Sequence, residues 1–180
     1  MGAELQFRSI PGLISYEAAR ELQLELVEKR AAGEIPDTIL FLEHEPVVTR
    51  GRGLQFTGLK DQAARERHMP MLTPLPQGVA FSESERGGDL TYHGPGQLVI
   101  YPICKLDGEG FGPHHDIAGF LRKFEQVLID EVDTWLQGQG NALARENATG
   151  VWVQLADKPE PRKVASMGIA VRRWVTYHGL

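Results

Sequence analysis

Apolar residues recur at helical spacing in two long segments of the chain. The first covers residues 15–31, where Ser15 can cap the start and Gly33 and Pro36 follow the end. Its apolar positions can share one face of a helix, and they are Tyr16, Ala19, Leu22, Leu26 and Val27. This pattern predicts an amphipathic helix that packs one face against a core.

The second segment gives the clearest helical pattern in the chain. Asp116 is a typical N-cap residue, and apolar residues recur at helical spacing after it. These positions predict a core-facing stripe made of Ile117, Phe120, Leu121, Phe124, Leu128 and Trp135. A shorter helix is expected over residues 61–68, before a proline-rich stretch.

Short apolar runs between the helices predict β-strands. Residues 38–43 and 97–101 are apolar enough to be buried strands, and residues 79–81 predict a shorter one. Later strands are expected over residues 150–154, 164–171 and 174–177, with residues 157–161 connecting the first two. Because helices and strands do not alternate regularly, we expect one α+β domain over residues 1–180. Its sheet would be mixed or antiparallel and flanked by helices.

Composition narrows the functional classes. The chain has 180 residues and a net charge of −5, which argues against a nucleic-acid binder. No apolar run reaches the roughly 20 residues that cross a bilayer, and the N-terminus lacks the apolar region of a signal peptide. We therefore expect a cytoplasmic protein without a membrane segment. Cys104 is the single cysteine, and its place after an apolar strand predicts a buried, unreactive thiol.

Residues 86–97 carry the most chemical content. Gly87 and Gly88 allow close approach of the backbone to a ligand, and Gly-Pro-Gly at residues 94–96 predicts a tight second turn. Between them, the Thr-Tyr-His sequence of residues 91–93 supplies a hydroxyl, an aromatic ring and an imidazole. We expect a turn-rich loop, which fits either ligand binding or a purely structural double turn. The glycine spacings of a dinucleotide-binding fingerprint and of a P-loop are both absent.

The remaining histidines give little indication of a site. His114 and His115 are adjacent, but no cysteine or carboxylate spacing completes a metal site around them. We expect neither a metal nor another cofactor.

The glycine-rich segment resembles a motif of the lipoyl(octanoyl) transferases, Arg-Gly-Gly-x-x-Thr-Tyr-His-Gly-Pro-Gly-Gln over residues 86–97. Other blocks agree with that family in order and spacing. They are Leu-Glu-His-x-Pro-Val-x-Thr at residues 42–49, Thr-Gly-Val-Trp-Val at 149–153, Lys-Val-Ala-Ser-Met-Gly-Ile at 163–169, and Arg172-Arg173 with His178-Gly179. The resemblance covers most of the chain.

The resemblance implies the fold shared by biotin and lipoate protein ligases, and a two-step acyl transfer. A cysteine thiolate would take octanoyl from octanoyl-acyl carrier protein. A lysine of a lipoyl domain of the 2-oxoacid dehydrogenases, or of the glycine-cleavage H protein, would then take the acyl group as an amide. This would be the first step of lipoate biosynthesis on proteins.

The resemblance also assigns roles to residues of this chain. Lys163 would be catalytic, because its ammonium group would lower the pKa of the cysteine thiol. From the residues alone, Lys163 is expected to be an ordinary surface lysine beside Arg162. The implied substrate-binding residues are Arg86, Gly87, Gly88, Asp89, Leu90, Thr91, Tyr92, His93, Ser166, Met167, Gly168, Gly179 and Leu180. The family's nucleophilic cysteine would lie beyond Leu180, so we expect a domain that is incomplete at its C-terminal end.

Two other interpretations stay open at this point. Arg-Gly-Arg-Gly at residues 50–53 resembles the basic glycine loop of biotin ligases, which would favour an ATP-dependent lipoate or biotin protein ligase of the same fold. The expected absence of the nucleophile would also suit a catalytically silent domain that binds lipoyl domains or acyl carrier protein.

Overall fold

A computed structural model describes residues 4–53, 74–108, 112–146 and 148–180 of the chain. Within these ranges the helices are α1 (Tyr16–Ala32) and α4 (Ile117–Leu136). The strands are β1 (Leu5–Ile14), β2 (Asp37–His44), β3 (Val47–Arg50), β4 (Ala80–Glu83), β5 (Leu90–His93), β6 (Val99–Ile103), β7 (Gly140–Arg145), β8 (Ala148–Leu155), β9 (Arg162–Ser166), β10 (Gly168–Arg172) and β11 (Val175–Gly179). The helix expected over residues 61–68 lies outside the described residues.

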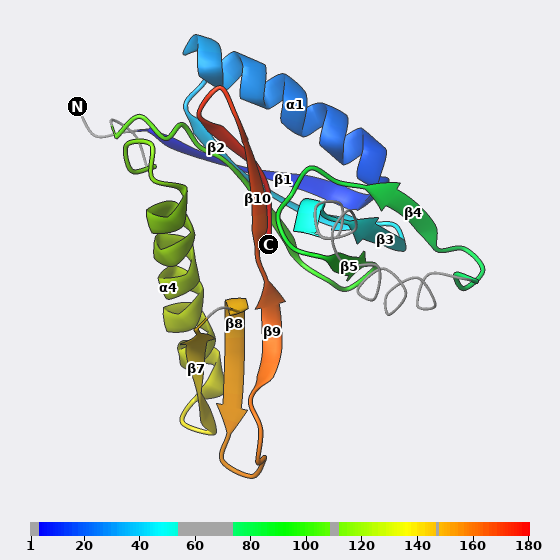
Figure 1. Cartoon of the computed structure of the whole chain (residues 1–180), viewed down its shortest axis with the longest axis vertical. Coiled ribbons are helices and arrows are strands. Elements are labelled where there is room, and N and C mark those ends of the chain that lie inside the picture. The colour runs from blue at the N-terminus through cyan, green and yellow to red at the C-terminus, as the bar shows by residue number, and fades with distance from the viewer. Residues whose placement is uncertain (1–3, 54–73, 109–111, 147) are drawn as a thin grey trace.

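A mixed sheet forms the centre of the fold (Figure 1). Strand β1 pairs parallel with β2, and β2 pairs antiparallel with β6. Strand β11 extends this sheet beside β6, because Thr176 N donates to Cys104 O at 2.9 Å and Leu180 N donates to Ile100 O at 2.9 Å. Strand β10 then pairs antiparallel with β11. The α+β fold with a mixed sheet is therefore confirmed.

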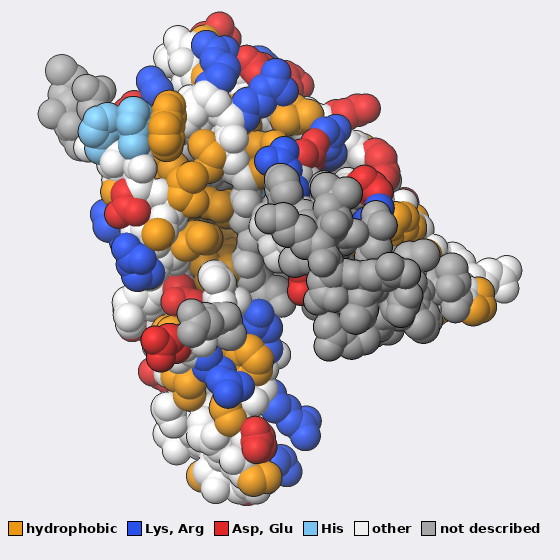
Figure 2. Space-filling model, viewed as in Figure 1, with side chains coloured by type: hydrophobic (Ala, Val, Ile, Leu, Met, Phe, Trp, Pro, Cys, Tyr) orange, Lys and Arg blue, Asp and Glu red, His pale blue; other side chains and the backbone are white. Residues whose placement is uncertain are grey.

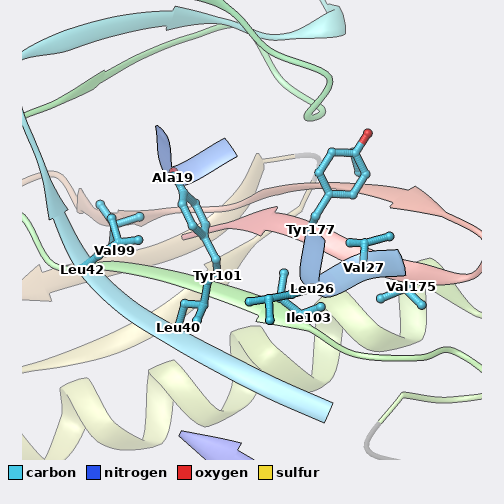
Figure 3. Packing of buried hydrophobic residues seen from close by; sticks show 11 residues of the cluster. Ala19, Leu26, Val27, Leu40, Leu42, Val99, Tyr101, Ile103, Val175 and Tyr177 are labelled. Carbon is cyan, nitrogen blue, oxygen red and sulfur yellow. The ribbon is translucent and has the colours of Figure 1, made fainter. Parts of the chain in front are cut away.

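Helix α1 covers one face of this sheet. Ser15 caps its start and Gly33 ends it in a left-handed conformation with φ 78°, as the sequence predicted. Side chains from α1, β2, β6 and β11 meet beneath it in one apolar cluster (Figure 3). Alternate residues of β2 serve opposite faces: Leu40 belongs to this cluster and Ile39 to the cluster beneath α4. Burial on both faces explains why β2 is a continuous apolar run.

Helix α4 packs against two sheets in succession. Phe120 and Phe124, near its start, lie in the cluster on the opposite face of the main sheet. Farther along, α4 contacts an arm formed by the antiparallel sheet β7-β8-β9, through Leu128, Ile129, Val132 and Leu136. The predicted stripe was wrong at its two ends, because Ile117 is 39% exposed and Trp135 is 65% exposed. The buried positions recur every four residues, and four residues are slightly more than one turn, so the stripe winds around the helix.

A third small sheet, in the order β4-β3-β5, holds the glycine-rich segment. Residues 90–93 form β5, whereas the sequence predicted a turn-rich loop there. The single strand predicted over residues 164–171 is also two strands, β9 and β10, which break at Met167 and pair with different neighbours. Among the described helices, none has the length and apolar character that crossing a membrane requires.

Candidate functional site

Arg86 lies buried at the start of the glycine-rich segment. Its guanidinium donates to Gly87 O at 2.9 Å, to Thr49 O at 3.0 Å, to Thr49 Oγ1 at 2.8 Å and to Asp89 O at 3.1 Å. These acceptors are all uncharged, and no group in the described part of the chain accepts a hydrogen bond from Nε. Burial therefore lowers the pKa of Arg86 from its ordinary value. The side chain fixes the loop into which it is folded and leaves a positive charge close to that backbone.

The loop after Arg86 packs directly on the end of β3. Gly51 N donates to Asp89 O at 2.8 Å, and Gly53 N donates to Gly88 O at 3.0 Å. A Cβ atom at Gly51 would clash with Gly88 O and come within 2.8 Å of the Arg86 guanidinium. Gly88 itself has φ 80°, which favours glycine. The basic glycine sequence of residues 50–53 thus serves as the support of this loop.

Three of the predicted binding segments meet at Gly168. Gly87 N donates to Ile169 O at 3.1 Å, which ties the glycine-rich loop to β10. A Cβ atom at Gly168 would come within 2.7 Å of Gly87 O, so only glycine permits this crossing. On its other side Gly168 pairs with Gly179 of β11. The structure therefore brings the glycine-rich loop at residue 87 against strands at residues 168 and 179, more than 80 positions farther along the sequence.

An apolar surface lies beside this crossing. Figure 2 shows hydrophobic side chains gathered between α4 and β10. The partly buried residues packed on this face of the sheet are Leu5, Phe41, Ile100, Met167, Ile169, Val171 and Leu180. Two predicted binding residues, Met167 and Leu180, thus belong to one apolar surface.

The Thr-Tyr-His residues of β5 have different surroundings. Thr91 O accepts a bond from Thr49 Oγ1 at 3.3 Å within the small sheet. Tyr92 is 53% exposed, and its ring lies over Gly94. His93 is buried, with Nδ1 2.8 Å from Gln97 Oε1. Burial lowers the pKa of His93 to about 4, so the imidazole is neutral at physiological pH. Leu90 is half-buried and Asp89 is exposed at the same rim.

Lys163 lies on the arm, in β9. Its Nζ donates to Thr149 O at 2.9 Å and lies 5.4 Å from the centre of the Trp152 ring. A Cβ atom at Gly150 would come within 2.8 Å of Lys163 Cε, so glycine at that position lets the lysine side chain cross the backbone of β8. The ammonium group is exposed and directed along the arm by β8. Ser166, three residues farther on, is exposed at the end of the same strand.

Sequence reasoning missed a buried polar network beneath α1. Tyr16 Oη donates to Ser84 Oγ at 2.7 Å, and His178 Nε2 lies 3.2 Å from Glu85 Oε2. Arg20 pairs with the same Glu85 carboxylate. Hydrogen bonds and the Arg20 charge hold the pKa of Glu85 far below its usual range, the bond with His178 having the largest effect. Polar residues at positions 16, 20 and 23 share one face of α1, and this spacing was the signal that could have indicated the network.

Cys104 lies in the apolar core and not at the surface of the candidate site. It is fully buried beside Phe120 and Phe124, and burial raises the pKa of its thiol well above the ordinary value. The prediction of a buried thiol is confirmed. In the described parts of the chain, no group of three or more His, Cys, Asp or Glu side chains is placed to hold a metal ion.

A comparison with family models decides the wider classification. Residues 15–180 match the model described as the lipoyl protein ligase A/B catalytic domain. The chain belongs to this family. The resemblance noted in the sequence is thereby confirmed, and the glycine crossing belongs to a lipoyl protein ligase A/B catalytic domain.

Curated relatives of this catalytic domain are octanoyltransferases. The protein of Geobacter metallireducens is 39% identical over 169 residues, which cover 93% of this chain and 66% of the relative. That of Gloeobacter violaceus is 40% identical over 171 residues, 94% of this chain and 65% of the relative. The chain thus spans about two thirds of the length of these relatives.

Solved structures support the ligase-like fold. A bipartite lipoate protein ligase from Thermoplasma acidophilum superposes with a TM-score of 0.52 at 16% identity, covering 99% of this chain and 60% of that one. LipL1 of P. falciparum in complex with lipoate gives a TM-score of 0.55 at 10% identity, covering 97% and 46%. At these identities the likeness concerns the fold alone.

Proposed function

We propose that this catalytic domain binds and transfers octanoyl groups in the cytoplasm. The donor would be octanoyl-acyl carrier protein. The acceptors would be lysines of lipoyl domains of the 2-oxoacid dehydrogenases and of the glycine-cleavage H protein. The observation that carries the proposal is the meeting of three predicted binding segments at Gly168, next to an apolar surface, in a chain whose curated relatives are octanoyltransferases.

The octanoyl chain would lie on the apolar surface that includes Met167 and Leu180. Each methylene group removed from water is worth about 0.8 kcal/mol, so an eight-carbon chain gains several kcal/mol from such a surface. The acyl carbonyl group of the octanoyl chain would then lie at the crossing of Gly87 and Gly168. The buried Arg86 charge lies beside that crossing and would favour negative charge that develops on the thioester oxygen.

Lys163 would donate a proton in the first step and accept one in the second. Its ammonium group would stabilise the thiolate of a cysteine that follows Leu180 in a longer polypeptide. The thiolate attacks the thioester carbonyl, a new carbon–sulfur bond forms, and the carrier thiol leaves with a proton from Lys163. The neutral acceptor lysine then attacks the acyl-cysteine. As the amide forms and the carbon–sulfur bond breaks, the proton of the acceptor amine returns to Lys163, and the thiolate is restored.

The ATP-dependent ligase is less well supported by the geometry of residues 50–53. Arg50 pairs with Glu83, and Gly51 and Gly53 are occupied by the loop of residues 86–89. Those groups therefore support the site wall, whereas an adenylate would need them free.

The decisive assay measures transfer of octanoyl from octanoyl-acyl carrier protein to an apo lipoyl domain. It compares the 180-residue chain with a chain extended beyond Leu180 by the segment of an octanoyltransferase relative. Transfer by the extended chain without ATP supports the proposal. Amide formation only with free octanoate and ATP would establish a ligase, and pull-down of either partner without turnover would establish a silent binding domain. Robust transfer by the 180-residue chain that survives Cys104→Ser would overturn the cysteine mechanism.

A further inference from the structure

Two segments border the candidate site: the loop that holds Arg86, residues 84–89, which we call the first wall, and the end of β11, which we call the second wall. Helix α1 contacts both walls through polar side chains. We propose that Tyr16, Glu85 and His178 form a clamp by which α1 fixes the loop of Arg86 against the end of β11, and that these three are positioning residues for acyl transfer. The inference rests on the proposed function. It assigns a role to Tyr16 and Glu85, which lie outside the family motifs, and to His178, which lies in such a motif but is not among the candidate binding residues.

The α1 side of the clamp is a stripe of polar residues. Tyr16, Arg20 and Gln23 follow one another at helical spacing and point into the fold: Tyr16 is 2% exposed and Gln23 is fully buried. Polar side chains at such positions lower the apolar area that a helix can bury. Each of the three makes a hydrogen bond to a residue of one of the two walls, Gln23 through its Oε1 alone.

The first wall is held through the residues that precede Arg86. Ser84 Oγ accepts from Tyr16 Oη at 2.7 Å and also from Arg86 N at 3.3 Å, so it links the helix to the loop backbone. Glu85 accepts from Arg20 with both carboxylate oxygens, Oε2 from Nε at 3.1 Å and Oε1 from Nη2. A bidentate arginine–carboxylate pair fixes direction as well as distance. The start of the glycine-rich loop is therefore tied to two turns of α1.

The second wall is held through His178. Its backbone N donates to Gln23 Oε1 at 2.6 Å, and its ring lies parallel to that of Tyr16, with an interplanar angle of 2°. His178 has φ 56°, a left-handed conformation that is uncommon for a residue with a side chain. Adjacent strand residues normally point to opposite faces, but here Tyr177 and His178 both turn toward α1. The next residue, Gly179, pairs with Gly168 at the crossing.

The two walls meet directly at the imidazole. His178 Nε2 lies 3.2 Å from Glu85 Oε2, and Nδ1 lies 3.4 Å from Tyr16 Oη. His178 is 1% exposed and the Glu85 side chain is 25% exposed, so these contacts are largely shielded from water and solvent replaces a lost partner poorly. Backbone strain that is held in place by several partners occurs preferentially at functional sites. The geometry therefore points to a fixed spacing between Arg86 and Gly179 as the purpose of the network.

Glu85→Ala tests the clamp, because it removes the group that contacts both Arg20 and His178. Glu25→Ala is the matched control, since Glu25 makes an exposed ion pair with Lys29 on the same helix. The second variant, Tyr16→Phe, removes one hydroxyl and keeps the ring, so it guards against simple failure to fold. Hydrogen exchange of peptides that cover residues 84–90 and 175–180 is measured in each variant, followed by octanoyl transfer in the extended chain.

The clamp predicts faster exchange in those two peptides and unchanged exchange in the arm, residues 140–166. It also predicts that kcat/KM falls ~100-fold in Glu85→Ala, since a displacement of about 1 Å at a reacting centre has that effect. Glu85→Gln, which keeps the shape and an acceptor oxygen, would restore part of this loss. Unchanged exchange in both peptides overturns the clamp whether or not the protein is active. Changed exchange with wild-type kcat/KM overturns the positioning role, and an inactive wild-type chain with changed exchange overturns the proposed function alone.

Discussion

The wall of the candidate site and the arm that carries Lys163 are held in different ways. Arg86 and His178 lie buried in the wall and bond to distant parts of the chain, Arg86 to Thr49 and His178 to Gln23 and Glu85. Lys163 is exposed, and it is directed by one backbone carbonyl and one aromatic ring of the neighbouring strand. Buried hydrogen bonds fix the residues of the wall, whereas two exposed contacts orient Lys163.

This difference fits the demands of acyl transfer. A site that binds an apolar acyl chain gains from rigid borders, because a preorganised site loses little entropy when the ligand binds. A group that donates and recovers a proton must change partners during the reaction. A single bond from Lys163 to Thr149 O can be exchanged for a thiolate at small cost, whereas the buried bonds of Arg86 cannot.

Replacement of Lys163 gives the largest effect in this comparison. Lys163→Met should lower octanoyl transfer by the extended chain by about 10²- to 10⁴-fold, the usual contribution of a general acid or base. The melting temperature should change little, because the side chain is exposed. Lys158→Met on the same arm is the control, since Lys158 pairs only with its exposed neighbour Asp157. Equal activity of the two variants would remove Lys163 from the mechanism.

Acidification should destabilise the fold through the buried His93 of the candidate site. The pKa of His93 is 6.5 in an unfolded chain and about 4 in the buried site, so the unfolded state binds the proton more readily. The full contribution of His93 is therefore present above pH 6.5 and is lost as the pH falls toward 4, by about 3 kcal/mol in total. Burial lowers the pKa values of His44 and His178 in the same direction.

Denaturant unfolding between pH 7 and pH 4.5 measures this loss. His93→Gln should flatten the dependence of the unfolding free energy on pH, and His114→Gln, which removes an exposed histidine instead, is the comparison. Identical slopes in all three proteins would contradict the assignment of a neutral, buried His93.

A methyl group added at the crossing should push the backbone of β10 at Gly168 away from the loop at Gly87. Gly168→Ala places Cβ 2.7 Å from Gly87 O, and relief of that contact should cost about 1–3 kcal/mol of stability. At Gly87 the nearest atom to a new Cβ is Ile169 O at 3.9 Å, so Gly87→Ala should cost less. Chemical denaturation gives both values, and the reverse order would mean that the crossing is not as close as described.

The smallest effect is expected from the ring that guides the lysine. Trp152→Leu removes a cation–π contact with Lys163, worth about 0.5–1 kcal/mol at an exposed site. Transfer should fall about two- to five-fold, through kcat more than through KM, because the ammonium group becomes less well directed. The same ring also lies 4.8 Å from the Arg145 guanidinium, so a loss as large as that of Lys163→Met would show that the ring does more than direct Lys163.

The local patterns of the sequence predicted the helices and several strands well. Ser15, Gly33 and Asp116 were correct as caps because capping depends on neighbouring residues alone. Strand β1 was not predicted, and most of its residues are exposed at a sheet edge, so it lacks the apolar pattern of β2. The break at Met167 was also missed, since nothing local indicates that β9 and β10 join different sheets.

For the candidate site too, sequence motifs predicted some features and missed those that depend on long-range contacts. The family motifs pointed to residues 86–93 and 166–168, and the structure brings those backbones together at Gly87 and Gly168. The roles given to these residues and to Lys163 stay predictions. The partners of Glu85 and His178 were not foreseen, because a hydrogen bond between residues 93 positions apart depends on the folded sheet.

Photo-crosslinking with an octanoyl amide that carries a diazirine at its far end tests the central claim most directly, because it needs no nucleophile. The account predicts that mass spectrometry finds the label on the apolar surface near Gly168, at residues such as Met167, Ile169 or Leu180, and that excess octanoyl amide competes it away. Labelling confined to the far end of the arm, around residues 157–161, or to the outer side of α1, would contradict it.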